Sequence, residues 1–326
     1  MRILFKIFFA LFSVAVLAMT GLAAYYRFAL PHTTAPGDLK VKMSPERIAR
    51  GRYIFQAVSA CGDCHSARDM SRVGGPFVPG RTGQGGILPI DGLPGRVVAT
   101  NLTPDVGTGM GSWTDGEKLH ALREGVSKDG HVLFPLMPYP SYRQMSDEDA
   151  ESVIAYLNSL PPIQNRLPPT RLHFPVSLLI RSIPQPAVHV PVPPRGVTVA
   201  YGKYLATLGD CLGCHTPEDK GKLKTELSFG GGRVFDSPVG PVVSANISPD
   251  RATGIGSWSE DNFVNRFKAY AKEADKPQPV ATPGNFTFMP WLSYSQMEES
   301  DLRAIFRYLQ AQKPIGNRVS IHPGQS

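Results

Sequence analysis

The first pattern along the chain is an uninterrupted apolar stretch near its start. Residues 7–24 carry no charge, and Arg2 and Lys6 precede them. This pattern predicts either a secretory signal peptide or one membrane-spanning helix, with the basic end held in the cytoplasm. The aromatic segment 25–28 favours a retained anchor, whereas the small residues 21–23 would suit cleavage. Under both interpretations we expect the rest of the chain to be exported.

Helical periodicity then appears at matching places in the two halves of the chain. Residues 44–55 and 146–157 predict helices, each with a serine that caps its first turn. Residues 200–204 and 301–309 show the same pattern, but Glu298 stands where the second capping serine would be, which predicts a weaker start. The sequence between these helices is rich in Gly and Pro and has few strand-like runs. We therefore expect an all-α fold with long loops.

The second half of the chain repeats the first. Three blocks occur twice in the same order, namely residues 61–65 and 211–215, residues 101–113 and 246–258, and residues 137–142 and 289–294. In the middle block, eight of the thirteen positions are identical. This order and spacing indicate a tandem duplication of one domain.

The duplication divides the chain into six segments. We predict a signal or anchor helix over 1–30, a linker over 31–43, one domain over 44–163, a Pro-rich linker over 164–195, a second domain over 196–318 and a tail over 319–326. Residues 161–195 contain ten prolines, which favours an extended, semi-rigid spacer. The apolar residues 178–180 within it are expected to dock on the protein by default, or on a partner or the membrane surface.

Each half carries a Cys-x-x-Cys-His motif. A Cys-x-x-Cys pair alone fits half a zinc site, a redox pair, a disulfide or covalent haem attachment, and the adjacent histidine favours haem. Two thiols can bond to the two vinyl groups, while the imidazole turns back onto the iron. A zinc site would need further Cys or His pairs, and a thioredoxin-like pair would need a βαβ setting. The sequence predicts two haem c groups, attached at Cys61 and Cys64 and at Cys211 and Cys214, with His65 and His215 as proximal iron ligands.

A methionine is the common sixth ligand of such haems. Met70 has no counterpart in the second half, and Met110 is replaced there by an isoleucine. Two matched pairs remain, Met137 with Met289 and Met145 with Met297. The second pair stands just before the closing helix, where an apolar residue commonly packs against the first turn. The first pair precedes proline in a stiff loop, so we predict Met137 and Met289 as iron ligands.

The middle repeated block lies between the two predicted iron ligands. Its tryptophan offers an apolar face and one N–H donor, which suits covering a haem edge and meeting a propionate. On this interpretation, the haem contacts are Asn101 and Trp113 in the first half and Asn246 and Trp258 in the second. The alternative is a structural wrap whose glycines serve turns. The other histidines lack a match or lie in linkers and tails, so we expect them at the surface: His32, His120, His131, His173, His189 and His322.

These motifs resemble those of dihaem or multihaem class I cytochromes c. The chain is most similar to the cytochrome subunits of bacterial membrane-bound alcohol and gluconate dehydrogenases and of related molybdenum hydroxylases. The resemblance covers residues 44–318 and rests on the three repeated blocks. The alcohol and gluconate dehydrogenase subunits typically have three haem domains, whereas this chain shows two.

The resemblance implies an electron-transfer subunit without catalysis of its own. Such subunits take electrons from a membrane-bound or periplasmic dehydrogenase and pass them to quinone, an oxidase or another cytochrome. It also implies haem domains on the periplasmic side of the inner membrane, held to the bilayer by the N-terminal helix. Two other functions stay open, a dihaem peroxidase, which would need a five-coordinate iron, and a cytochrome subunit of a terminal oxidase.

The distribution of charge removes one further class of function. The formal net charge is +7, but the segment 44–163 has an excess of acidic residues and 196–318 is nearly neutral. The positive charge lies in residues 1–43 and in the linker 164–195, which holds four arginines and no acidic residue. We therefore expect no nucleic-acid partner. The charged segments are placed to face lipid head groups or a partner protein.

Overall fold

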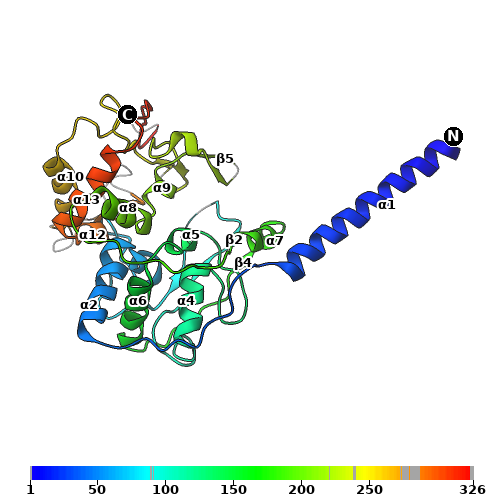
Figure 1. The fold of residues 1–326 in the computed structure, drawn as a ribbon, viewed down its shortest axis with the longest axis horizontal. Coiled ribbons are helices and arrows are strands. Elements are labelled where there is room, and N and C mark those ends of the chain that lie inside the picture. Colours follow the sequence, from blue (N-terminus) through cyan, green and yellow to red (C-terminus); the bar gives the residue numbers. More distant parts are fainter. Residues whose placement is uncertain are drawn as a thin grey trace.

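The computed structural model describes residues 2–88, 90, 92–219, 221–237, 240–271, 273, 279 and 287–323. The protein is mostly helical with little strand, as expected. The helices of the first repeat gather in one lobe and those of the second in another, and a long N-terminal helix projects away from both (Figure 1).

This projecting helix is the apolar segment at the start of the sequence. It comprises α1 (Arg2–Ala24), which continues into one π-helical segment, η1 (Tyr25–Ala29), and none of its residues is buried. Its length and composition are sufficient to cross a membrane. The helix therefore fits a signal or an anchor, the two alternatives that the sequence left open.

In the first repeat, two long helices frame the fold. α2 (Pro45–Tyr53) continues as η2 (Ile54–Val58) into α3 (Cys61–His65), and α6 (Asp147–Ser159) closes the repeat. The serines before α2 and α6 both accept a hydrogen bond from a first-turn backbone N–H, at 3.2 Å, which confirms the predicted caps. Between them lie α4 (Asp115–Glu124) and α5 (Tyr139–Tyr142).

The second repeat has the same arrangement. α8 (Val199–Leu208) leads into α9 (Cys211–Cys214), and α13 (Glu299–Gln310) closes the repeat after α10 (Glu260–Lys268) and α12 (Trp291–Tyr294). Glu298 makes no side-chain cap for α13, as expected from the sequence. The repeat relation thus extends from sequence motifs to the order of helices.

Glycine permits the close crossing of the first and last helix in each repeat. A Cβ atom at Gly51 would lie 1.8 Å from the carbonyl oxygen of Ser152 in α6, and one at Gly202 would lie 1.8 Å from that of Ala304 in α13. Each oxygen is fixed in the backbone of its helix, so it can move away only if the whole helix moves. The crossings therefore require glycine at both positions.

Alanine at either crossing should destabilise the fold. We expect Gly51→Ala and Gly202→Ala each to cost about 2 kcal/mol or more, because the two helices must move apart. The measurement is the melting temperature of the full chain, followed by circular dichroism. Gly316→Ala is the matched control, since no atom lies within 4 Å of the added methyl. Equal losses in all three variants would contradict the account.

Within the described residues, the named strands depart from a purely helical fold and pair as four antiparallel ribbons with two residues in each strand. They pair β1 (Gly86–Ile87) with β3 (Val98–Ala99), β2 (Gly95–Arg96) with β4 (Arg171–Leu172), β5 (Glu218–Asp219) with β6 (Lys222–Leu223), and β7 (Val234–Phe235) with β8 (Val242–Val243). All lie in the long loops. Such short pairings leave little periodicity in a sequence.

The Pro-rich linker lies along the first repeat and is not a free spacer. Strand β4 and the short helices α7 (Val176–Leu179) and η3 (Ile180–Ser182) belong to it. The buried guanidinium of Arg123 donates to the carbonyl of Val188 at 2.6 Å, and the backbone N–H of Asp147 donates to that of Val190 at 3.0 Å. Donors of the first repeat thus bind linker carbonyls and hold this extended segment against that repeat.

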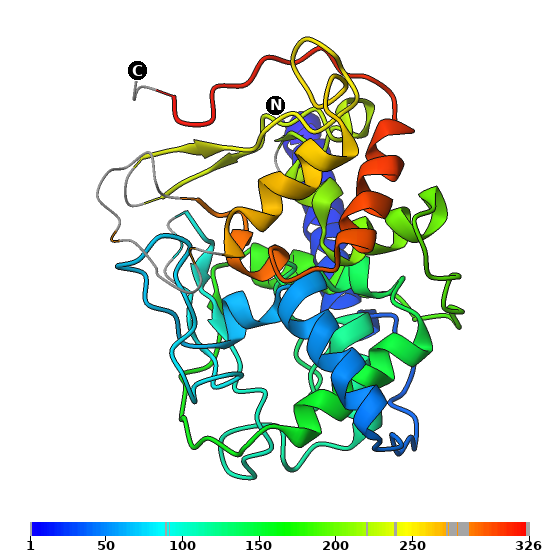
Figure 2. The ribbon, with the colours of Figure 1, turned by 90° about the vertical axis from the view of Figure 1, so that its left-hand side faces the viewer.

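The two repeats pack directly on each other through reciprocal tyrosines. The Tyr53 hydroxyl accepts from the backbone N–H just before α13 (3.0 Å) and donates to Asp301 (2.7 Å). The Tyr204 hydroxyl accepts from the backbone N–H of Ser146 (3.2 Å) and donates to Asp149 (2.7 Å). Each repeat thus supplies a cap for the closing helix of the other. Buried residues of both repeats form one continuous core, and η2 lies against α12 (Figure 2).

Candidate functional site

The predicted attachment cysteines lie on two matching helical turns. Ala60 and Asp210, the residues just before α3 and α9, adopt left-handed backbone conformations with φ of 46° and 49°. This lets the chain turn sharply from the preceding helix into the motif. The two cysteines of each motif are three residues apart, so they lie on neighbouring positions of one helical face. Each motif therefore presents two thiols side by side.

The histidine of each motif is held through one ring nitrogen. Nδ1 of His65 is 2.8 Å from the carbonyl oxygen of Thr100, and Nδ1 of His215 is 2.8 Å from that of Ala245. A carbonyl can only accept, so Nδ1 carries the proton and Nε2 keeps its lone pair for a metal. Burial lowers the pKa of both histidines, which favours the neutral imidazole that binds iron.

The carbonyls that hold the histidines directly precede the repeated middle block. Asn101 donates to the carbonyl of Ile163 (2.7 Å) and to Thr108 (3.2 Å), and Asn246 repeats the first bond with Ile315 (2.7 Å). These bonds fasten the block to the chain that follows the closing helix. Both asparagines thus have the structural role that was the alternative to haem contact, because they hold the repeated block in place. Contact of Asn101 and Asn246 with a haem stays a prediction.

The tryptophans of the block stand just before α4 and α10. Trp113 is half-buried and 37% of Trp258 is exposed. Their backbone N–H groups donate at 3.1 Å to the carbonyls of Met110 and Ile255, which are both buried. The tryptophan side chains thus lie at the edge of each repeat, and their contact with a haem also stays a prediction.

The structure places the two matched methionine pairs in different surroundings. Met145 and Met297 are fully buried in the shared core, at 0% and 2% exposure, as expected for packing residues. Met137 and Met289 are half-buried and lie at the edge of that core. Both also accept a backbone hydrogen bond at 2.7 Å from the residue two positions later. Their local geometry therefore repeats as closely as their sequence.

The tyrosine of the third repeated block ties the methionine loop to the cysteine motif. The Tyr142 hydroxyl donates to the carbonyl of Ser59 at 3.3 Å, and the Tyr294 hydroxyl donates to that of Gly209 at 2.8 Å. Both acceptors lie two residues before the first cysteine. The sequence motifs alone predict no role for this tyrosine, although its presence in both blocks is a signal that could have revealed one.

The serine of the same block joins the two candidate sites to each other. Ser141 donates at 2.8 Å to Asp210, just before the second cysteine motif, and Ser293 donates at 2.5 Å to Asp63, inside the first motif. Burial raises the pKa of both aspartates. Each methionine loop thus contacts the cysteine motif of the other repeat, so the two sites meet at the interface between the repeats.

The surroundings of the cysteines are unlike those of a reactive thiol pair. Burial raises the pKa of Cys61 and of Cys211 to about 12, whereas redox-active pairs have lowered values. Within the described ranges, no three His, Cys, Asp or Glu residues converge to hold a metal ion. The donors in each repeat are two thiols, one imidazole with a free Nε2 and one thioether. This donor set fits a covalently attached haem c with histidine and methionine on the iron.

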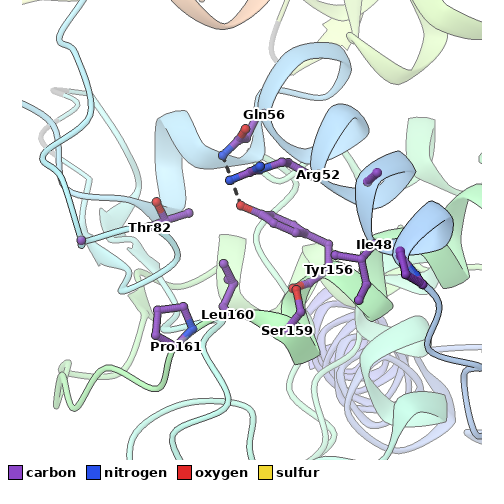
Figure 3. A pocket seen from close by; sticks show the side chains of 11 residues that line it. Ile48, Arg52, Gln56, Thr82, Tyr156, Ser159, Leu160 and Pro161 are labelled. Atoms are coloured by element: carbon purple, nitrogen blue, oxygen red, sulfur yellow. Dashed lines mark hydrogen bonds between the residues drawn. The ribbon is translucent and has the colours of Figure 1, made fainter.

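A hollow on the outer side of the first repeat is separate from these donors. It lies between α2 and α6, where Gln56 donates to the Tyr156 hydroxyl at 3.2 Å and Arg52 points toward the same group (Figure 3). None of the predicted haem-binding residues lines it.

One of the six histidines expected at the surface is buried, which corrects the prediction. His120 lies on the inner face of α4 beside Glu124.

Comparison with known proteins shows what the chain is similar to. Residues 48–161, which make up most of the first repeat, match the family model of cytochrome c. It is 31% identical to the gluconate 2-dehydrogenase cytochrome c subunit of Pantoea cypripedii, over 81% of this chain and 59% of the relative. It is 29% identical to the cytochrome c subunit of the quinone alcohol dehydrogenase of Gluconacetobacter polyoxogenes, over 82% and 56%.

A third relative is similar in length. A dihaem c-type cytochrome of Cereibacter sphaeroides is 29% identical over 83% of this chain and 90% of its own length. The chain thus spans less than 60% of the length of the two dehydrogenase subunits and most of the dihaem protein. The resemblance to cytochrome subunits of alcohol and gluconate dehydrogenases is confirmed.

Proposed function

We propose that this chain is a dihaem cytochrome c that relays electrons from a partner dehydrogenase to the respiratory chain. The observation that carries the proposal is the pair of matching donor sets that meet at one interface. Under this proposal, residues 44–163 and 196–318 are two cytochrome c domains. Two redox groups held so near each other would pass electrons within a single molecule.

The residues of each repeat have distinct roles in this proposal. The cysteine pairs would attach the haems, His65 and His215 would each ligate an iron through Nε2, and Met137 and Met289 would each supply a thioether ligand. The haem itself supplies the one-electron chemistry. The carbonyls of Thr100 and Ala245 orient the imidazoles, and the shared core keeps water from one side of each site. Histidine with methionine raises the reduction potential, which suits a relay.

The partners and the location follow from the relatives and from the N-terminal helix. The relatives are named as subunits of gluconate and alcohol dehydrogenases, so a membrane-bound or periplasmic dehydrogenase is the proposed donor. Quinone, an oxidase or another cytochrome is the proposed acceptor. The helix α1 would hold both domains on the periplasmic side of the inner membrane.

A test of the relay separates it from the peroxidase and oxidase alternatives. We expect the ferric full chain to show the methionine-to-iron charge-transfer band from both haems and to consume peroxide no faster than free haem. We further expect the complex isolated from membranes to contain a dehydrogenase subunit. Rapid peroxide consumption, or a complex containing an oxidase core, would contradict the proposed function.

A further inference from the structure

We propose that the protein touches the bilayer at a second place, through a juxtamembrane surface made of η1, Phe174 and α7, which ends at Leu179. Large apolar side chains are exposed there. Phe28 is 82% exposed, Phe174 is 80% exposed, and Leu179 is 49% exposed. Among the described large apolar residues beyond residue 30, Phe174 is the most exposed. Exposed apolar side chains that gather in one place typically mark a site where a protein or a membrane binds.

The juxtamembrane surface is fastened to the end of the N-terminal helix. Arg181 in η3 donates to the carbonyl of Tyr26 at 2.8 Å and to that of Arg27 at 3.3 Å, and it also contacts the carbonyl of Leu30. Beside these bonds Ile180 and Leu30 are both buried, with 7% of each exposed. Helix α7 therefore lies against η1, at the C-terminal end of the N-terminal helix, as the ribbon shows (Figure 1).

The length of the helix fixes the level of this surface relative to a bilayer. The uncharged stretch 7–24 rises about 27 Å at 1.5 Å per residue, close to the roughly 30 Å of hydrocarbon in a membrane. The segment η1 then emerges at the level of the lipid head groups. Because Arg181 bonds to three carbonyls of residues 26–30, α7 must lie at the same level.

The charges around the surface favour lipid head groups as its occupant. Two of the linker's four arginines, Arg171 in β4 and Arg181 in η3, lie next to this surface, and the linker has no acidic residue. Arg171 pairs in register with Arg96 across the β2–β4 ribbon, and both side chains are exposed. Arg27 lies in η1 itself. Aromatic and basic side chains together are typical of a membrane interface, where the rings enter the head-group layer and the cations bind phosphate.

Two points of contact would orient the haem-binding domains. A single helix lets the domains rotate about its axis, whereas a second contact fixes which face meets the membrane and its proteins. This inference depends on retention of α1, a part of the proposed location, and is independent of haem binding. Electron transfer to a membrane partner would then start from one defined orientation.

The test uses the full chain in vesicles of phosphatidylethanolamine and phosphatidylglycerol that contain a photoactivatable lipid. We expect cross-links to the peptide around residues 172–182 as well as to α1, and expect the first set to be lost in the double variant Phe174→Ser and Leu179→Ser. The matched control is Val106→Ser, which removes an apolar side chain that is 72% exposed elsewhere. Haem content is measured in every sample, so loss of haem is recognised separately.

Several results would overturn the inference. One is a cross-linked α1 with no cross-link to residues 172–182, which would leave that surface for a partner protein. Another is an equal yield of cross-links in the double variant and the wild type. A mature chain that lacks α1 and has no cross-links would also overturn it, while its haem content would still report on the proposed function.

Discussion

Replacing Met137 by leucine should remove the thioether ligand of one haem and lower its reduction potential, with the other haem unchanged. Leucine keeps the volume of the side chain but cannot bind iron. Axial ligands set haem potentials over a range of roughly 0.8 V, so we expect a fall on the order of 0.1 V or more. A redox titration should show this fall in reduction potential. The methionine-to-iron absorption band should fall by about half, because one of the two matched ligands is lost.

The matched variants make this result specific. Met289→Leu should produce the same change at the second haem, because its loop has the same geometry. Met145→Leu should leave the band and both potentials unchanged, because Met145 is fully buried in the core. If Met145→Leu, rather than Met137→Leu, removed the absorption band, the assignment of the ligand would be wrong.

The second large effect is expected at Asp149, where the two repeats meet. Its carboxylate accepts two hydrogen bonds from Arg50, both at 2.8 Å, and one from Tyr204 at 2.7 Å. Asp149 is 0% exposed and Arg50 is 12% exposed. The variant Asp149→Ala would leave the guanidinium buried without its counter-charge, which typically costs about 3–5 kcal/mol. Chemical denaturation of the full chain measures the loss.

An ion pair that is more exposed and joins the same two helices supplies the control. Arg47 and Glu151 also join α2 to α6 at 2.8 Å, but about a quarter of each side chain is exposed. We expect Glu151→Ala to cost at most about 1 kcal/mol, because water solvates the remaining charge. Similar losses for Glu151→Ala and Asp149→Ala would mean that burial does not set the strength of this contact.

The features that could be predicted from the sequence are those with local signals. The serine caps, the order of helices and the apolar N-terminal helix each follow from residues a few positions apart. The duplication set aside Met70 and Met110, which have no methionine counterpart in the second repeat. The proline that follows Met137 and Met289 then distinguished this pair from the pair before the closing helix. Local pattern and internal repeat together therefore located the candidate site.

The interface between the repeats could not be predicted in the same way. Tyr53 and Asp301 are 248 residues apart in the chain, and no periodicity links them. A partial signal existed, because Tyr53 matches Tyr204 and Asp301 matches Asp149 in the repeat. Matched polar residues on otherwise apolar helices indicate a shared partner, but they do not tell whether that partner lies in the same repeat or the other.

The position of the linker and the burial of His120 could not be predicted for a related reason. Composition describes a free chain, and ten prolines favour an extended one, but tertiary contacts decided where the linker lies. The lack of a matching histidine in the second repeat indicated that His120 serves no shared chemistry. It gave no information about burial on the inner face of α4.

The central claim, that each cysteine pair holds one haem, is tested most directly by counting haems per chain. The measurement is the intact mass of the full chain, exported from cells that attach haem c, for the wild type and two double variants. We predict two haems for the wild type, and one each for the variants Cys61→Ala with Cys64→Ala and Cys211→Ala with Cys214→Ala. A wild-type chain without covalent haem, or the same count in all three proteins, would contradict the claim.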